Sequence, residues 1–216
     1  MVLTPTKNTV EDTTGTGFDS SDDEGELDLS PFEFSWLLLN GEENEKLGIS
    51  GLPGRKFKET WRSLDNDIKC LKSAGVNEVF SLCTNGELNK YRVPWLLTEL
   101  TGADILVHHY PFPDGMIPNM GALIKMIDEI KVSAKNGRKP LVHCYGGLGR
   151  ASLVAVCTLL VIDESLEPEK AIEKIRELRG PGAIQSVKQY NFVCEFRQLY
   201  ADYKKEHDSE ARSVSR

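Results

Sequence analysis

The stretch "KPLVHCYGGLGRASLVAVCTLLVID" (139–163) decides the fold. It begins with a short apolar run that ends at Cys144, which is typical of a buried strand. A loop with three glycines follows, and Arg150 then opens an almost entirely apolar segment, which indicates a helix covered on all sides. We therefore expect a strand, a tight loop and a central helix, the arrangement from which parallel sheets are built.

The glycine loop, residues 144–150, predicts a binding site for a tetrahedral anion. Glycines allow backbone angles that other residues avoid, so successive amide groups can turn inward and form an anion-binding concavity at the start of the helix. The planar guanidinium of Arg150 matches two oxygens of a phosphate, and these surroundings favour the thiolate of Cys144 as a nucleophile aimed at phosphorus. The expected phosphate-binding residues are Tyr145, Gly146, Gly147, Leu148, Gly149 and Arg150.

Strand-like and helix-like segments alternate along the rest of the chain. We expect strands at 32–39, 76–83, 104–111 and 139–144. We expect helices at 58–75, 87–102 with a break near Pro94, 121–137, 150–163, 167–180 and 185–207. This alternation predicts one α/β domain over 31–207, with a central, mostly parallel sheet flanked by helices. Ligands of such sheets bind beyond the carboxyl ends of the strands, where Cys144 is expected.

Both ends of the chain are polar. Residues 1–30 include "FDSSDDEGELD" (18–28) and contain too little apolar surface to offset the entropy of ordering, so we expect a disordered acidic tail. Ser20 and Ser21 stand directly before acidic residues, which makes phosphorylation by an acid-directed kinase an alternative to a merely solvated tail. Residues 208–216 are expected to form a short polar tail.

The composition argues against several classes of function. A formal net charge of -7 argues against a broad electrostatic grip on nucleic acid or an anionic membrane. No apolar run approaches the ~20 residues of a membrane span, and no secretory signal is visible, so we expect a cytoplasmic monomer, with a perinuclear or nuclear location as the alternative. The five cysteines are widely spaced and the four histidines lack zinc-like spacing, so we expect no disulfide framework, metal or cofactor.

The remaining cysteines are expected to be buried hydrophobic residues: Cys70, Cys83, Cys157 and Cys194. Whether Cys83 can trap Cys144 in a disulfide stays open.

The expulsion of an alkoxide or phenoxide from phosphorus requires a proton donor. "YPFPDGMIPN" (110–119) offers Asp114, which follows a strand end and therefore belongs to the same sheet edge as Cys144. Read alone, Asp114 with the glycine after it is a turn signal, and only the glycine loop favours a catalytic role. Asp104 and Asp128 are weaker candidates. His143 is expected to orient the glycine loop through its ring nitrogens, or else to be a core histidine.

The segment "HCYGGLGR" (143–150) resembles the Cys-x5-Arg signature of the protein tyrosine phosphatase superfamily. The stretches 57–97 and 178–197 are similar to a member of its dual-specificity branch that acts on cyclin-dependent kinases. The resemblance implies a metal-free phosphatase for phosphothreonine, phosphoserine and phosphotyrosine, with a phosphocysteine intermediate and Asp114 as the acid. It further implies a cell-cycle substrate, a cyclin-dependent kinase phosphorylated on its activating threonine. It also brings Gln185 and Gln189 near the pocket, whereas the sequence alone is equally compatible with a solvated helix face.

One position departs from the family pattern. Ala151 follows Arg150, where the family usually has a serine or threonine whose hydroxyl stabilises the departing thiolate. Ser152 stands one position later, and because one helical step rotates a side chain by about 100°, we expect it not to replace that hydroxyl fully. The alternative to a phosphatase is therefore a catalytically slowed phosphoprotein- or kinase-binding inhibitor.

Overall fold

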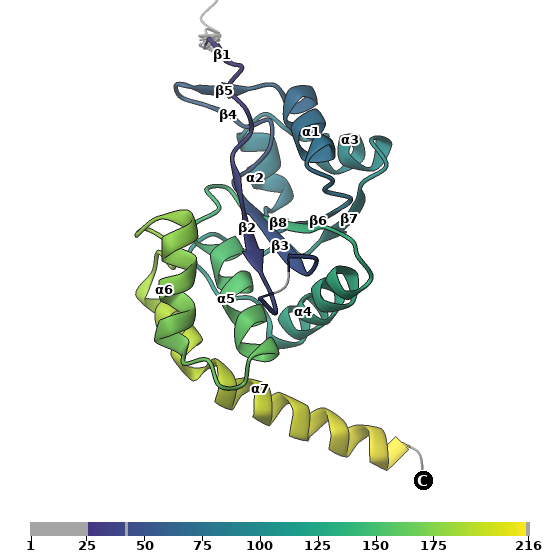
Figure 1. Ribbon diagram of the computed structural model, residues 1–216, viewed down its shortest axis with the longest axis vertical. Helices are drawn as coiled ribbons and strands as arrows, with labels where there is room; N and C mark the ends of the chain where they lie inside the picture. Colours follow the sequence, from purple (N-terminus) through teal and green to yellow (C-terminus); the bar gives the residue numbers. More distant parts are fainter. Residues whose placement is uncertain (1–25, 42, 215–216) are drawn as a thin grey trace, which may run out of the picture.

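The computed structural model describes residues 26–41 and 43–214, with side chains described to residue 207. Its main sheet has five strands in the order β2-β3-β8-β6-β7 (Figure 1). These are β2 (Phe34–Leu38), β3 (Lys46–Ser50), β8 (Pro140–His143), β6 (Glu78–Ser81) and β7 (Leu106–His109). All neighbours are parallel except β2 with β3, which confirms the predicted mostly parallel sheet.

Helices cover both faces of this sheet, because side chains alternate between the faces along each strand. One layer contains α4 (Met120–Lys135), α5 (Arg150–Ile162), α6 (Pro168–Arg179) and α7 (Val187–Val214). The other contains α1 (Leu64–Ser73), α2 (Asn85–Lys90) and α3 (Leu96–Gly102). On β6, Phe80 packs in the first layer and Val79 in the second. The α/β architecture is thus confirmed.

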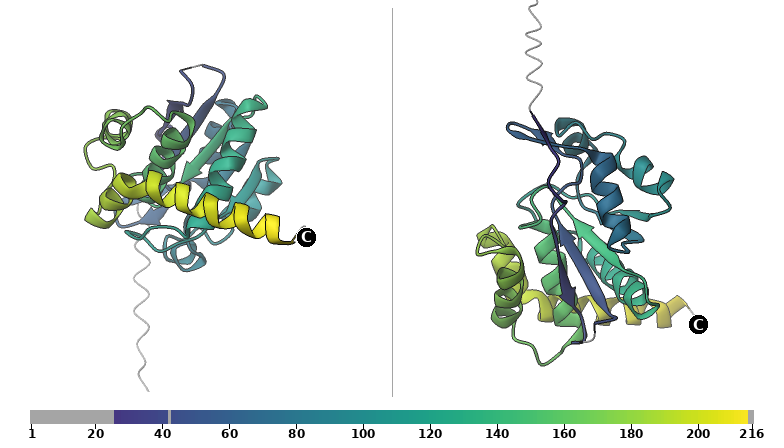
Figure 2. Two further views of the ribbon diagram at one scale, coloured as in Figure 1. Left: turned by 90° about the horizontal axis from the view of Figure 1, so that it is seen from below. Right: turned by 45° about the horizontal axis from the view of Figure 1, so that its top comes forward.

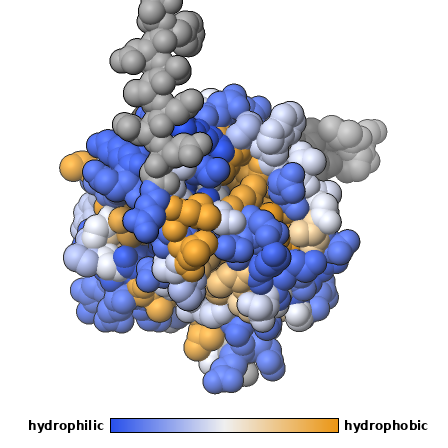
Figure 3. Space-filling view, turned by 90° about the horizontal axis from the view of Figure 1, so that it is seen from above, coloured by the Kyte–Doolittle hydropathy of each residue, from blue (hydrophilic) through white to orange (hydrophobic). Residues whose placement is uncertain are grey.

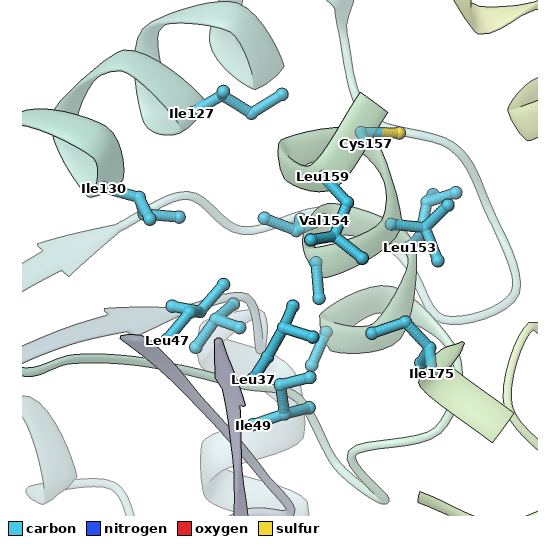
Figure 4. Close-up of a cluster of buried hydrophobic side chains, with 14 of the residues drawn as sticks. Leu37, Leu47, Ile49, Ile127, Ile130, Leu153, Val154, Cys157, Leu159 and Ile175 are labelled. Carbon is cyan, nitrogen blue, oxygen red and sulfur yellow. The ribbon is translucent and has the colours of Figure 1, made fainter. Parts of the chain in front are cut away.

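The core is centred on α5, as its apolar sequence predicts. Leu153, Val154 and Leu159 of this helix are almost completely buried. Figure 4 shows them among side chains from the strands, from α4 and from α6. Because α5 begins at Arg150, this packing fixes the position of the glycine loop that precedes it.

A second, three-stranded sheet was not predicted. Its order is β1-β5-β4, formed by Leu27–Asp28, Thr60–Arg62 and Lys56–Phe57. The helix expected over 58–75 begins only at Leu64, so the first part of that prediction is wrong. Trp61 has helical spacing to Leu64 and Ile68, but it lies in β5. Ser63 caps α1 by accepting a hydrogen bond from the amide of Asn66.

Buried Arg62 joins this small sheet to α1. Its guanidinium donates to Asp67 of α1 at 2.8 Å and to Asp28 of β1 at 2.7 Å. Residues 27–28 therefore pair with the domain, although the sequence assigns them to the disordered tail 1–30. Residues 1–25, with the rest of that prediction, lie outside the described residues.

The break predicted near Pro94 is confirmed, whereas the boundary of the last helix differs from its prediction. The segment 87–102 forms two helices, and the break between them contains Pro94 and Arg92, whose φ is 58°. At the other end, α7 continues to Val214, so its backbone is helical well into the predicted polar tail 208–216. Figure 2 shows α7 running across the end of the helical layer, where it packs against α4 and α5.

Candidate active site

The glycine loop connects β8 to α5 and wraps around the sulfur of Cys144. Cys144 is 1% exposed, and its Sγ accepts a hydrogen bond from the amide of Gly147 at 3.2 Å. From α5, the hydroxyl of Ser152 donates to the carbonyl of Gly147 at 3.0 Å. The hydroxyl of Ser152 therefore holds the loop backbone, and buried Ala151 has no hydroxyl to offer.

Two of the loop glycines make close contacts, and at Gly147 the contact is with backbone, so glycine is required there. Gly147 has a φ of 73°, and a Cβ there would lie 2.7 Å from the backbone of Ser50 at the end of β3. A Cβ on Gly149 would lie 2.8 Å from the side-chain oxygen of Gln185. A side chain at position 147 would displace the loop from β3, whereas one at position 149 would push the side chain of Gln185 aside.

Arg150 is fully buried and held on several sides. One terminal nitrogen, Nη1, donates to the carbonyls of Leu82 at 3.0 Å and Phe112 at 2.8 Å. Both terminal nitrogens donate to the carboxylate of Glu87, at 2.8 Å and 2.5 Å. Burial alone would lower the pKa of Arg150, but the bonds to Glu87 and nearby Cys144 raise it above its ordinary value. The guanidinium is a fixed, permanent positive charge.

Glu87 is the functional residue that sequence reasoning missed. Partial burial raises its pKa, but the hydrogen bonds from Arg150 and from the backbone of Thr84 hold the pKa below its ordinary range. Thr84 and Glu87 form a capping box at the start of α2, a signal that the sequence does contain. That signal explains the helix start and gives no hint of the contact with Arg150, which is 63 positions away.

Asp114 lies where the sequence predicts an acid. Its Oδ1 is 3.2 Å from Nε of Arg150, and its side chain is 56% exposed. The surrounding acid loop, residues 113–117, is tied to the start of α7: the hydroxyl of Ser186 donates to the carbonyl of Gly115 at 3.2 Å. Asp104 and Asp128, the weaker candidates, lie near Lys72 and Lys131 instead.

Gln185 and Gln189 both lie beside the glycine loop, at the position of Gly149. They do not share a helix as predicted, because α7 begins at Val187 and Gln185 precedes it in a segment where Ile184 has a φ of 59°. Gln189 is completely buried, and its amide nitrogen is 3.4 Å from the carbonyl of Met116 in the acid loop. Its side-chain oxygen has no hydrogen-bond partner within the described residues.

His143 directly precedes the glycine loop, and the backbone of Cys144 acts on its ring by partly offsetting the effect of burial on its pKa. The imidazole is completely buried, and neither ring nitrogen has a hydrogen-bond partner among the residues that the structure describes. Burial lowers its pKa to about 4, so the ring is neutral at physiological pH. Its burial agrees with a core histidine, and an orienting role for the ring stays a prediction.

Arg179, at the end of α6, is a second basic residue that the sequence reasoning did not single out. A Cβ on Gly147 would lie 2.6 Å from its Nη2, so this guanidinium lies against the glycine loop. Its Nη1 donates to the hydroxyl of Ser35 at 3.2 Å, and burial lowers its pKa. The remaining loop contacts are backbone bonds from Leu52 to Tyr145 and from Ile184 to Leu148.

The five cysteines are all free thiols. Cys83 follows β6, the strand beside β8, and burial raises its pKa. Cys157 is buried as predicted, but Cys70 is half-buried and Cys194 on α7 is exposed, so the prediction of burial fails for these two. Within the described residues, no three His, Cys, Asp or Glu side chains gather as they would around a metal ion, and no helix is long and apolar enough to cross a membrane.

Comparisons with known proteins agree with this geometry. The family model described as cyclin-dependent kinase inhibitor 3 matches residues 8–172. Cyclin-dependent kinase inhibitor 3 of Rattus norvegicus is 47% identical over 201 residues, which are 92% of this chain and 95% of that protein. Protein tyrosine phosphatase type IVA 3 of Mus musculus is 31% identical over 137 residues, 62% of this chain and 72% of that protein.

A solved structure extends the likeness to the fold. It is a crystal structure of kinase-associated phosphatase in which the catalytic-site cysteine is replaced by serine. The two chains match with a TM-score of 0.76 and 44% identity, over 81% of this chain and 98% of that one. The resemblance of the stretches 57–97 and 178–197 to kinase-associated phosphatase is confirmed, and the chain belongs to the cyclin-dependent kinase inhibitor 3 family.

Proposed function

We propose that this protein is a dual-specificity protein phosphatase that works through a phosphocysteine intermediate. One observation carries the proposal: Cys144 and Arg150, at the two ends of the glycine loop, meet Asp114 of the acid loop, whose Oδ1 is 3.2 Å from Nε of Arg150. A nucleophile, a fixed cation and an acid are the three groups that transfer of a phosphoryl group to sulfur requires.

In the first step, the loop amides and Arg150 hold the phosphoryl oxygens while the thiolate of Cys144 attacks phosphorus. An S–P bond forms, the P–O bond to the substrate breaks, and Asp114 gives its proton to the departing oxygen. In the second step, water attacks phosphorus and passes a proton to the carboxylate of Asp114, and the thiolate leaves. We assign the orientation of that water to Gln185 and Gln189, and their position beside Gly149 supports this assignment.

The proposed substrate is a cyclin-dependent kinase phosphorylated on the threonine of its activation loop. The names of the relatives, cyclin-dependent kinase inhibitor 3 and kinase-associated phosphatase, support a kinase partner. Asp114 is exposed at the mouth of the loop, which is compatible with a protein substrate. We expect release of phosphate from a phosphothreonine kinase, measured with and without its cyclin.

A slowed, phosphate-binding form of the same protein is the second candidate, and Ala151 favours it. Ala151 is buried with no hydroxyl, and the hydroxyl of Ser152 is occupied by Gly147. In a pre-steady-state assay, the slowed form would release one equivalent of product in a burst and then turn over poorly. Ala151→Ser should then speed the second step by about tenfold, the value of one hydrogen bond of about 1.4 kcal/mol. An unchanged rate would show that another group already supplies this contact.

The proposal is tested by Cys144→Ser with Cys194→Ser as its control, because Cys194 is exposed on α7. Cys144→Ser should abolish hydrolysis of a phosphothreonine peptide and keep phosphate binding, measured by calorimetry. Cys194→Ser should leave both unchanged. Retained turnover in Cys144→Ser would remove the nucleophile assignment.

A further inference from the structure

A group of cations without carboxylate partners lies on the small sheet and on the segment after α2. Arg55, Lys56, Lys58, Lys90 and Arg92 form no ion pair within the part of the chain that the structure describes. The chain as a whole has a net charge of -7, so this concentration of unpaired positive charge is a local feature. It marks a site for a negatively charged partner.

Each of these cations lies over an aromatic ring. Arg92 is 4.9 Å and Lys56 5.9 Å from the centroid of Trp61. The remaining distances are 5.6 Å from Lys58 to Phe57, 5.4 Å from Lys90 to Tyr91 and 5.6 Å from Arg55 to Tyr145. We call these five cations and four rings the aromatic–basic surface. Figure 3 views this end of the molecule, where hydrophilic and hydrophobic side chains lie next to each other.

The aromatic–basic surface reaches the proposed active site through Tyr145, the residue after Cys144. The ring of Tyr145 stacks on Tyr91 with 4.1 Å between centroids, and Phe57 contacts both rings edge-on. A segment bound on this surface would therefore lie beside the mouth of the glycine loop, in the path of a protein substrate.

The described part of the chain begins at this surface. In β1, Leu27 pairs in parallel with Trp61, so Glu26, the first described residue, lies on the side of the tip of the β4–β5 hairpin, where Lys58 is exposed. The residues before Leu27 include the acidic segment, defined as 19–26, which contains Asp19, Asp22, Asp23, Glu24 and Glu26. Six extended residues span about 20 Å, enough to cross a hairpin whose strands are about 5 Å apart.

We propose that the acidic segment docks on the aromatic–basic surface of its own chain and competes there with protein substrates. The segment and the surface carry equal numbers of opposite charges, five each. Each exposed pair is weak, but the tether keeps the local concentration of the segment on the order of millimolar. The contact is therefore reversible and sensitive to salt.

Phosphorylation of Ser20 or Ser21 adjusts this competition. Both serines lie within the acidic segment, and each phosphate adds about -1.5 to -2 charges at neutral pH. By charge alone, the phosphorylated segment would bind the surface more tightly.

Cross-linking of the full chain tests the docking directly. A carbodiimide joins lysines to carboxylates that are in ion-pair contact, and a mixture of labelled and unlabelled chains distinguishes links within a chain from links between chains. At low salt we expect links within a chain from the acidic segment to Lys56, Lys58 or Lys90, and none to Lys135 on α4. Links to Lys135 as frequent as those to the surface, links only between chains, or no links at all would overturn the proposal.

A kinetic experiment tests the competition, and it rests on the proposed phosphatase function, whereas the cross-linking does not. In the full chain carrying Asp19→Asn, Asp22→Asn, Asp23→Asn and Glu24→Gln, kcat/KM for an acidic phosphothreonine peptide should rise about threefold to tenfold at low salt. High salt should remove the difference, and p-nitrophenyl phosphate, which is too small to reach the surface, should show none.

A second variant distinguishes docking of the acidic segment from the rival possibility that the surface binds an acidic part of the substrate. If kcat/KM for the peptide is unchanged by neutralising the acidic segment but falls in Lys58→Gln/Arg92→Gln, the surface binds the substrate's own acidic flank and the proposal is wrong. If the segment docks as proposed, it has nothing to bind once Lys58 and Arg92 are neutralised. The kcat/KM of the variant that combines both sets of substitutions should then equal that of Lys58→Gln/Arg92→Gln alone.

Discussion

Two regions of the molecule hold their positive charges in opposite ways. At the glycine loop, Arg150 is fully buried and donates to two backbone carbonyls and to both carboxylate oxygens of Glu87. On the aromatic–basic surface, Arg92 is exposed over Trp61 and has no ion pair within the described residues. A reacting phosphoryl group needs donors that are fixed in advance, whereas a reversible contact is better served by side chains that can adapt.

The largest effect should come from the acid beside the fixed cation. Asp114→Asn removes the proton donor, so kcat for a phosphothreonine peptide should fall by about 10²- to 10⁴-fold. An aryl phosphate with a good leaving group should lose much less, because its oxygen departs without a proton. Steady-state kinetics on both substrates check this, with Asp104→Asn as the exposed control. Equal losses on both substrates would contradict the acid role.

Removal of the carboxylate that holds Arg150 should damage stability as well as activity. Glu87→Gln leaves the buried guanidinium with only the exposed carboxylate of Asp114 as a charged partner, and we expect a loss of about 3 kcal/mol in the free energy of unfolding. Urea denaturation measures this loss. Glu99→Gln on α3 is the matched control, since Glu99 is exposed and forms no ion pair among the described residues. A loss as small as that of the control would show that the two carbonyl partners and Asp114 are sufficient to hold Arg150.

Buried His143, the last residue of β8, should make the free energy of unfolding depend on pH under acidic conditions. Its pKa is about 4 in the folded chain and 6.5 ordinarily, so between these values the unfolded chain binds a proton here and the folded chain does not. Stability should therefore fall as the pH drops through this window, by on the order of 2 kcal/mol between pH 7 and 5. The fall measured by urea denaturation should be smaller in His143→Asn, and an equal fall would assign the dependence to other groups.

The smallest effect should come from the exposed counterpart of Arg150. Arg92→Gln removes a cation that lies over a ring in solvent, so the free energy of unfolding should change by less than about 0.5 kcal/mol. Arg150→Gln, measured in the same denaturation series, should cost several times more. Similar losses in the free energy of unfolding for Arg92→Gln and Arg150→Gln would mean that burial does not make Arg150 more important for stability than exposed Arg92.

The sequence predicts the glycine loop far better than the aromatic–basic surface. Cys144, the glycines and Arg150 are consecutive, and the strand and helix around them carry unambiguous apolar patterns, so the unit from β8 to α5 can be read locally. Asp114 could be found only through the need for an acid, because Asp-Gly alone indicates a turn. The sequence does not predict Glu87 and Arg179 as parts of the site, because their contacts with the glycine loop form only in the tertiary fold.

The β4–β5 hairpin shows why local pattern fails elsewhere. Trp61, Leu64 and Ile68 have helical spacing, yet Trp61 pairs with Lys56 and Leu27 in the small sheet. The signal that was available is Ser63, an N-cap followed by acidic residues in the first turn of α1. The ion pairs of Arg62 with Asp28 and Asp67 join three segments, and no window of sequence contains that information.

The central claim is that phosphate passes through the sulfur of Cys144. The most direct measurement is to mix the full-length enzyme with a phosphothreonine peptide, quench within the first turnover and locate the phosphate by mass spectrometry. We expect one phosphoryl group per chain on Cys144, and none in Cys144→Ser. Peptide hydrolysis with no phosphate on Cys144 at any quench time, or with phosphate on another residue, would contradict the account.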